Sequence, residues 1–142
     1  MATARPRKLF VNIPVHDLKR SVDFYTRLGF AFDQRFTDDT ATCMIVSDDA
    51  YFMLLTEERF REFAKKPVAN PSDETAALFA LTVGDRAEVD AMVDAAIGAG
   101  GSYAADRMDH GFMYGWSFYD PDGHHWEVVY MDASGEPGGD KR

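Results

Sequence analysis

The chain has 142 residues, of which 46% are hydrophobic, and its 24 acidic and 15 basic residues give a formal net charge of −9. This length suits one domain that buries about 70% of the surface exposed by its unfolded chain. The charge argues against nucleic-acid binding, because neutralising phosphates requires a concentrated basic surface. No apolar run approaches the roughly 18 residues of a membrane-spanning helix. We therefore expect neither a nucleic-acid nor a membrane partner.

The single cysteine bears on the cellular compartment. Cys43 cannot form an intrachain disulfide and lies in an apolar run, which favours a buried core thiol over a reactive one. The basic N-terminal residues are not followed by the apolar stretch of a signal peptide. Both observations predict a cytoplasmic protein.

The first predicted elements are a strand over residues 8–15 and a helix over residues 18–28. Alternation along the strand places Phe10 and Asn12 on one face and the aliphatic residues on the other. Asp17 is a natural N-cap for the helix, which should cover the aliphatic face.

Three short apolar runs follow, separated by pairs of aspartates, and they predict an antiparallel meander. These runs cover residues 30–37, 42–47 and 51–56. The order of elements is therefore β-α-β-β-β. A short helix over residues 57–66 and a polar segment over residues 67–75 complete this half.

The second half repeats the first in outline. An offset of 68 residues places Phe10 on Leu78 and Asp17 on Asp85, and a second strand and capped helix are predicted there. The strand covers residues 78–83, the helix residues 86–97, and three further strands residues 102–107, 114–119 and 124–131.

A tight turn joins the last two predicted strands. Asp120-Pro121-Asp122-Gly123 supplies a proline suited to the second position of a type I turn and a glycine able to adopt positive φ. The turn predicts a β-hairpin whose second strand carries Glu127.

The two halves predict an α+β fold in which two pseudosymmetric βαβββ modules form a curved mixed sheet around a central cavity. We expect an N-terminal extension over residues 1–7, a single domain over 8–131 and a flexible tail over 132–142. Within the domain, module one covers residues 8–56, a linker 57–75 and module two 76–131.

Three stretches carry a family resemblance: residues 15–30 (VHDLKRSVDFYTRLGF), residues 81–85 (LTVGD), and Asp120–Gly123 leading to Glu127. Together they resemble the vicinal-oxygen-chelate superfamily, which comprises glyoxalases, bleomycin-resistance proteins and extradiol dioxygenases. The resemblance covers roughly residues 8–131, and among the enzymes it points to a lactoylglutathione lyase-like protein. It also implies a homodimer, because family members commonly dimerise.

The resemblance further implies four metal-ligand positions. Metal-dependent members hold a divalent ion with inward-facing His, Glu or Gln side chains, two from each half. In this chain the positions fall on Phe10, about Leu54, Leu78 and Glu127. Only Glu127 can bind a metal, because benzyl and isobutyl groups offer no lone pairs. We therefore expect no cofactor; the alternative is a divalent metal at Glu127 that recruits His125 from the same strand face.

The leading functional hypothesis is a protein that binds a small organic molecule in an apolar cavity, without the usual metal centre. The predicted cavity residues are Phe10, Asn12, Leu54, Leu78, Ala80, Trp116 and Glu127. The alternative is an enzyme of the lactoylglutathione lyase or extradiol dioxygenase type, with Glu127 as its base and His125 or Tyr114 assisting. The residues leave open whether the protein is catalytic or whether Glu127 only stabilises the hairpin through a neighbour.

The strand before the turn also leaves an alternative open. Its aromatic residues have strand period, and the intervening residues include a further tyrosine and a serine. The sequence does not decide which set faces the ligand: Phe112, Tyr114, Trp116 and Phe118, or Met113, Gly115, Ser117 and Tyr119.

Overall fold

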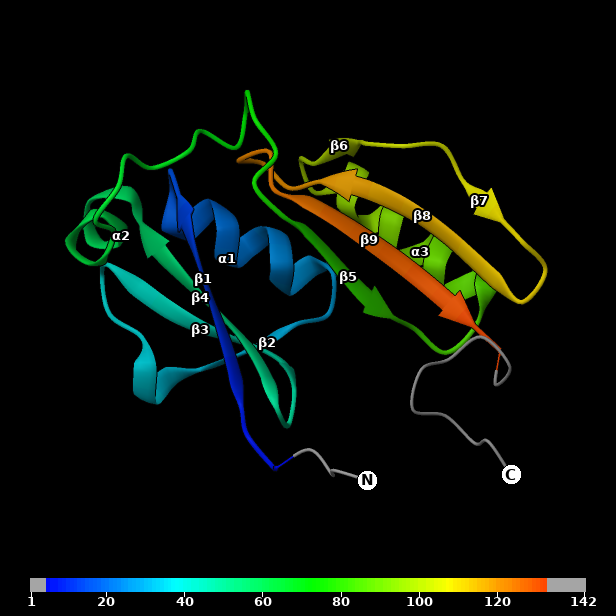
Figure 1. Cartoon of the computed structure of the whole chain (residues 1–142), viewed down its shortest axis with the longest axis horizontal. Helices are drawn as coiled ribbons and strands as arrows, with labels where there is room; N and C mark the ends of the chain where they lie inside the picture. The colour runs from blue at the N-terminus through cyan, green and yellow to red at the C-terminus, as the bar shows by residue number, and fades with distance from the viewer. Residues whose placement is uncertain (1–4, 133–142) are drawn as a thin grey trace. The chain divides into compact units, whose positions relative to one another are not determined.

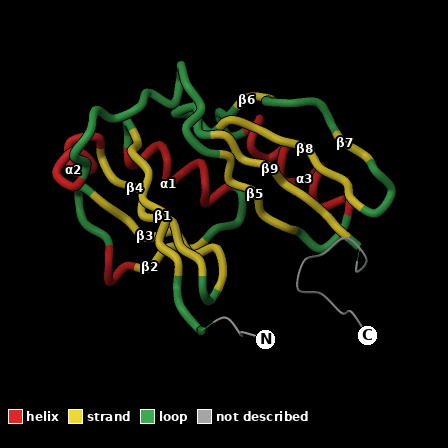
Figure 2. The backbone as a smooth tube through the Cα atoms, viewed as in Figure 1, coloured by secondary structure: helices red, strands yellow, loops and turns green. Residues whose placement is uncertain are grey.

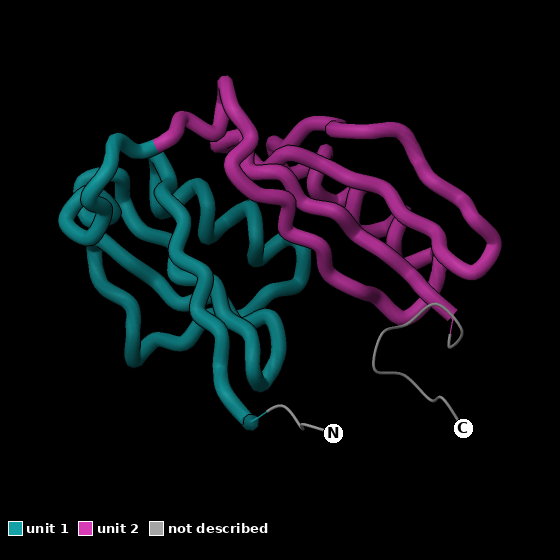
Figure 3. Tube along the Cα trace, viewed as in Figure 1, with its two compact units in different colours: residues 1–68 teal, residues 69–142 magenta. Residues whose placement is uncertain are grey.

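The computed structural model describes residues 5–132, and the chain forms two compact units, residues 1–68 and 69–142 (Figure 3). The first unit has the predicted β-α-β-β-β order, and the second has the same order with one additional short strand, β-α-β-β-β-β, which confirms the predicted α+β class and the repeat in outline. Whether the two units act as the single domain predicted for residues 8–131 stays a prediction. Residues 1–4 of the expected extension and 133–142 of the expected tail lie outside the described residues. Within the described part, no helix is both long and apolar enough to span a membrane.

The first unit is a four-stranded sheet with two helices (Figures 1 and 2). The strand order is β1-β4-β3-β2; β1 is parallel to β4, and the other neighbours are antiparallel. In chain order the elements are β1 (Leu9–Val15), α1 (Leu18–Arg27), β2 (Ala31–Asp33), the 3-10 turn η1 (Gln34–Phe36), β3 (Ala41–Ser47), β4 (Ala50–Thr56) and α2 (Glu57–Phe63).

Local polar contacts determine where helix α1 begins and where strand β2 ends. A side-chain oxygen of Asp17 accepts a hydrogen bond from the Arg20 amide at 3.1 Å, so the predicted N-cap is confirmed. The strand predicted for residues 30–37 is too long. It ends at Asp33, because the carboxylate of Asp33 accepts from the Arg35 amide at 3.0 Å and turns the chain into η1.

The second unit is a mixed sheet covered on one face by α3 (Figure 1). Its strand order is β5-β9-β8-β6, with β7 also paired to β8, and β5 is parallel to β9. The elements are β5 (Leu78–Thr82), α3 (Arg86–Gly98), β6 (Ser102–Tyr103), β7 (Met108–Asp109), β8 (Met113–Tyr119) and β9 (His125–Met131).

Helix α3 begins with the same signal as α1. A side-chain oxygen of Asp85 accepts from the Glu88 amide at 2.8 Å, and a Glu88 carboxylate oxygen accepts from the Gly84 amide at 2.9 Å. This arrangement is the predicted capping box. Val89, Val93 and Ala96 are the buried residues of the helix.

The strand predicted for residues 102–107 is corrected to a two-residue pairing. Only Ser102 and Tyr103 pair with β8 there. The Ala105 amide instead donates to the Ser117 hydroxyl at 2.8 Å. Because a side chain replaces a ladder partner, the chain leaves the sheet until Met108 pairs again.

The predicted hairpin turn is confirmed. The Gly123 amide donates to the Asp120 carbonyl at 2.9 Å, and Gly123 has a φ of 100°. Asp120 is buried, and one of its carboxylate oxygens accepts from the Asp122 and His124 amides, each at 2.9 Å. The turn therefore holds β8 and β9 in antiparallel register, with Ser117 opposite Glu127.

Candidate functional site

The open face of the second sheet carries the predicted acid. Cross-strand pairing places Ala80, Glu127 and Ser117 in one row, and Leu78, His125 and Tyr119 in the next. Side chains opposite each other in a sheet share a face. Leu78, Ala80 and Glu127, three of the predicted cavity residues, therefore share the face opposite the buried Trp126 and Val128.

Glu127 is paired with a histidine on this face. His125 Nε2 lies 2.5 Å from Glu127 Oε2, and the two side chains are 13% and 21% exposed. The Tyr119 ring packs edge-on against the imidazole, with ring centroids 5.3 Å apart. Nearby Leu78 is 60% exposed. The pair can accept or donate a proton, because it couples a histidine to a carboxylate at an accessible sheet face.

Tyr114 and Trp116 lie on the other face of the same strand, which corrects their expected position beside Glu127. The Tyr114 hydroxyl donates to Asp90 Oδ1 of α3 at 2.7 Å, and this hydrogen bond, aided by burial, raises the pKa of Tyr114 above its ordinary value. The Arg107 guanidinium lies 3.7 Å from the centroid of the Trp116 ring. Because Ser117 pairs with Glu127, the set containing Ser117 and Tyr119 lies on the face of Glu127.

Trp116 instead lines a hollow on the α3 side of the second unit. The hollow has a volume of about 700 Å³. Tyr103 stacks on Trp116 with ring centroids 5.3 Å apart, while Arg107 also forms an ion pair with Asp90 at 3.3 Å. The side-chain contacts of this hollow attach the irregular 104–107 segment to the sheet.

Leu54 is also on a different face from the one expected. Phe10 pairs with Tyr51, Asn12 with Met53, and Ile13 with Leu54. Leu54 is therefore fully buried on the face of Ile13, away from Phe10 and Asn12. Successive side chains of a strand point to opposite faces, so an error of one residue in the predicted position moves a side chain to the other face.

The internal repeat identifies the counterpart of Glu127 in the first unit. Glu127 pairs with Ala80, and the equivalent pair on β4 and β1 is Met53 with Asn12. Met53 rather than Leu54 therefore occupies the position that corresponds to Glu127.

The donor atoms at these positions do not fit the metal centre implied by the resemblance. Phe10 and Leu78 have no donor atoms, and the thioether of Met53 is a soft, weak ligand. Glu127 has the one carboxylate, and it is bonded to His125. Within residues 5–132 there is no group of three or more His, Cys, Asp or Glu side chains arranged to hold a metal ion. The donor set of this chain therefore differs in chemistry from the His, Glu or Gln set that the resemblance implies.

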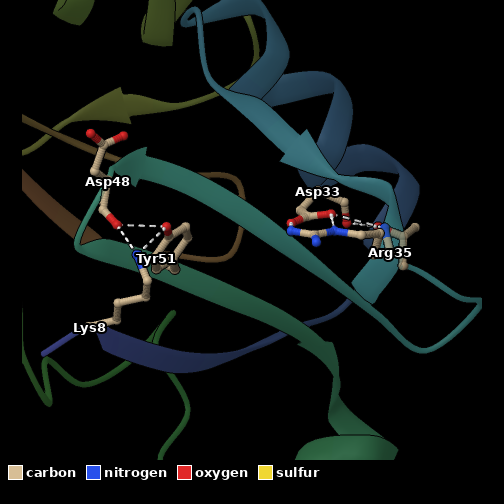
Figure 4. A network of polar contacts seen from close by, with 6 residues as sticks. Lys8, Asp33, Arg35, Asp48 and Tyr51 are labelled. Carbon is tan, nitrogen blue, oxygen red and sulfur yellow. Dashed lines mark hydrogen bonds and ion pairs between the residues drawn. The ribbon is translucent and has the colours of Figure 1, made fainter.

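The open face of the first sheet carries a polar network that the sequence analysis did not identify (Figure 4). Lys8 Nζ donates to the Asp48 carbonyl at 2.6 Å and to the Tyr51 hydroxyl at 3.4 Å. The Arg35 guanidinium donates twice to the Asp33 carboxylate, at 3.1 and 2.8 Å, and lowers the pKa of that carboxyl. The sequence could have indicated that Lys8 and Phe10 share a face, because they are two residues apart. That Tyr51 lies beside them depends on the pairing of β1 with β4, which the sequence does not reveal.

The profile of the Glyoxalase/Bleomycin resistance protein/Dioxygenase superfamily matches residues 9–128. The chain belongs to this superfamily. Its fold is similar to that of a hypothetical protein from S. aureus, with a TM-score of 0.76, 23% identity, and coverage of 90% of this chain and 96% of that chain. A glyoxalase-related enzyme from Fulvimarina pelagi is similar with a TM-score of 0.75 and 19% identity, covering 87% of each chain.

A third glyoxalase-fold structure is a glyoxalase/bleomycin resistance protein/dioxygenase family enzyme from Burkholderia phytofirmans PsJN. Its TM-score is 0.71 at 17% identity, covering 86% of this chain and 96% of that chain. Among curated proteins, no sequence matches the chain significantly. At these identities the solved structures establish the glyoxalase-type fold alone.

Proposed function

We propose that this protein binds small organic molecules on the open faces of its sheets, where exposed apolar side chains lie beside polar ones, and lacks the superfamily's usual metal centre. The observation that carries the proposal is the donor set: among the four equivalent positions, only Glu127 has a carboxylate, and His125 is bonded to it. An apolar surround with one polar pair is typical of small-molecule sites, in which a few polar groups orient the ligand.

Exposed apolar side chains on these faces support ligand binding. Leu78 is 60% exposed on the face of Glu127, and Phe10 is 46% exposed on the open face of the first sheet. Each sheet therefore exposes a large apolar side chain on its open face, as a binding surface requires.

A neutral aromatic probe, 2-naphthamide, tests this proposal. Its binding to the face of Glu127 is followed by the chemical shifts of the amides of β5, β8 and β9, in the wild type and in two leucine variants. Leu78→Asp places a charge on the face of Glu127 and is expected to weaken binding about tenfold, because the charge must be desolvated beside the ligand. Leu9→Asp is the matched control, since Leu9 is 62% exposed but does not share the face of Phe10. Equal losses in both variants would contradict a site on the proposed face.

The metal-free part of the proposal has its own test. Equilibrium dialysis against Zn²⁺, Mn²⁺ or Fe²⁺, followed by elemental analysis, is expected to find well below one tightly held ion per chain. Stoichiometric binding that is lost in Glu127→Gln would overturn this part.

The second candidate is an enzyme, and the His125–Glu127 pair specifically favours it. With Nε2 held by the carboxylate, the imidazole has a fixed orientation, as a general base requires. Turnover of a hemithioacetal or a catechol that disappears in both Glu127→Gln and His125→Gln would support a lyase or dioxygenase activity. If the wild type turns over neither substrate, with or without added metal, binding remains the better hypothesis.

We also propose that the protein is a cytoplasmic homodimer. The resemblance supports the dimer, and the buried thiol of Cys43 suits a reducing compartment. Light scattering during size-exclusion chromatography is expected to give twice the mass of one chain, whereas a monomer mass across the concentration range would contradict the dimer.

A further inference from the structure

A stacked aromatic pair forms an exposed platform on the open face of the first sheet. The rings of Phe10 and Tyr51 lie 4.8 Å apart between centroids, with 15° between their planes. They come from neighbouring strands at paired positions. Flat aromatic surface of this kind favours flat ligands, because stacking adds to the burial of apolar area.

A lysine beside this platform carries a charge that its contacts do not neutralise. The Lys8 ammonium lies 5.4 Å from the centroid of the Tyr51 ring. The two oxygens that accept its hydrogen bonds are the Asp48 carbonyl and the Tyr51 hydroxyl, neither of which carries a full negative charge. Figure 4 shows the carboxylate of Asp48 pointing away from the ammonium.

The other cation of this network differs in one respect. The Arg35 guanidinium is bound by the Asp33 carboxylate through two hydrogen bonds, so its charge is largely compensated. The Lys8 ammonium therefore provides the uncompensated positive charge of the Lys8–Phe10–Tyr51 cluster. A cationic ligand would be repelled there, whereas an anionic group would gain an ion pair.

We propose that the Lys8–Phe10–Tyr51 cluster recognises a planar aromatic acid, with the ring against Phe10 and Tyr51 and the carboxylate at the Lys8 ammonium. This inference rests on the proposed small-molecule binding and deepens it by naming the ligand class. It assigns Lys8 a specificity role that the positions implied by the family resemblance do not include.

The test compares two probes of nearly the same shape, 2-naphthoate and neutral 2-naphthamide, in calorimetric and chemical-shift titrations. Wild type is expected to bind naphthoate about two- to fivefold more tightly at low salt, the range of one exposed ion pair. The preference should shrink at 1 M salt, where the Debye length is about 3 Å.

Lysine variants separate the local charge from the charge of the whole chain. Lys8→Met is expected to remove the preference for naphthoate and leave naphthamide binding unchanged, while Lys8→Arg keeps the preference. The matched control is Lys19→Met on α1, where Lys19 is paired with Asp23 at 3.2 Å. The overall charge of −9 repels naphthoate almost equally in Lys8→Met and Lys19→Met, so it cancels in this comparison.

The outcomes distinguish the two levels of the proposal. Naphthoate bound no more tightly than naphthamide in the wild type, or an unchanged preference in Lys8→Met, would overturn the aromatic-acid inference and leave the proposed function standing. If neither probe shifts amide signals on the open faces, the proposed function itself is overturned.

Discussion

Gly123 is the position in the β8–β9 turn where one added carbon should have the largest effect. Its φ of 100° lies in the left-handed region. A Cβ there would contact the Pro71 carbonyl oxygen and lie 2.8 Å from the Pro71 carbonyl carbon and 2.9 Å from the Ser72 Cα. These are backbone atoms, so no rotamer change can relieve the overlap.

Gly123→Ala is expected to destabilise the second unit by about 2–5 kcal/mol, from about 1–2 kcal/mol of left-handed strain and about 1–3 kcal/mol of backbone displacement. With an m-value of about 2 kcal/mol/M, the urea midpoint falls by about 1–2.5 M. Both tryptophans, Trp116 and Trp126, belong to this unit, so fluorescence reports its unfolding.

The matched control for this turn is Gly100→Ala. Gly100 has a φ of 111° in the same unit, and no atom lies within 4 Å of its added Cβ. Gly100→Ala should therefore cost only the left-handed strain, about 1–2 kcal/mol. If Gly123→Ala is no more destabilising than Gly100→Ala, the close approach of the turn to Pro71 is refuted.

Three further predictions concern other sites. Leu54→Ala should lower the free energy of unfolding by about 2–5 kcal/mol, because Leu54 is fully buried. Leu78→Ala should change it by less than about 0.5 kcal/mol in urea titrations, because Leu78 is exposed. Equal losses of stability would contradict the faces assigned to the two residues. The Arg86 guanidinium lowers the pKa of Asp109 from 3.8 to about 2. Since the folded-state pKa is depressed, the stabilisation from this pair is present above about pH 4 and is lost as the pH falls towards 2; a carboxyl NMR titration with its midpoint near 4 would contradict it. Burial raises the pKa of the Cys43 thiol, so Ellman's reagent should label it far more slowly in the native protein than in urea, and equal rates would show that the thiol is accessible.

Several features of the fold were predictable because they depend on residues close in sequence. At the N-caps, the carboxylates of Asp17 and Asp85 each accept a hydrogen bond from the backbone amide three residues later in the chain. The β8–β9 turn likewise depends on adjacent Asp, Pro and Gly residues. The repeated order of elements followed from these signals.

The candidate site was predictable in part. Glu127, Leu78 and Ala80 were expected on one face, and the register of β5, β9 and β8 places them there. Tyr114 and Trp116 were candidates for that face, but the sequence left open which alternating set of β8 faces Glu127, because both sets contain large side chains. Alternation shows which residues share a face, but the packing of α3 decides which face is covered.

Local sequence signals were sufficient for the helix caps, the hairpin turn and the one carboxylate, Glu127, among the four implied ligand positions. Three further features depend on the folded chain: Met53 rather than Leu54 corresponds to Glu127, His125 is bonded to Glu127, and Lys8 lies over Tyr51. They depend on it because they follow from strand register. Cross-strand neighbours are set by pairing between distant segments, and a shift of one residue exchanges the buried face for the open one.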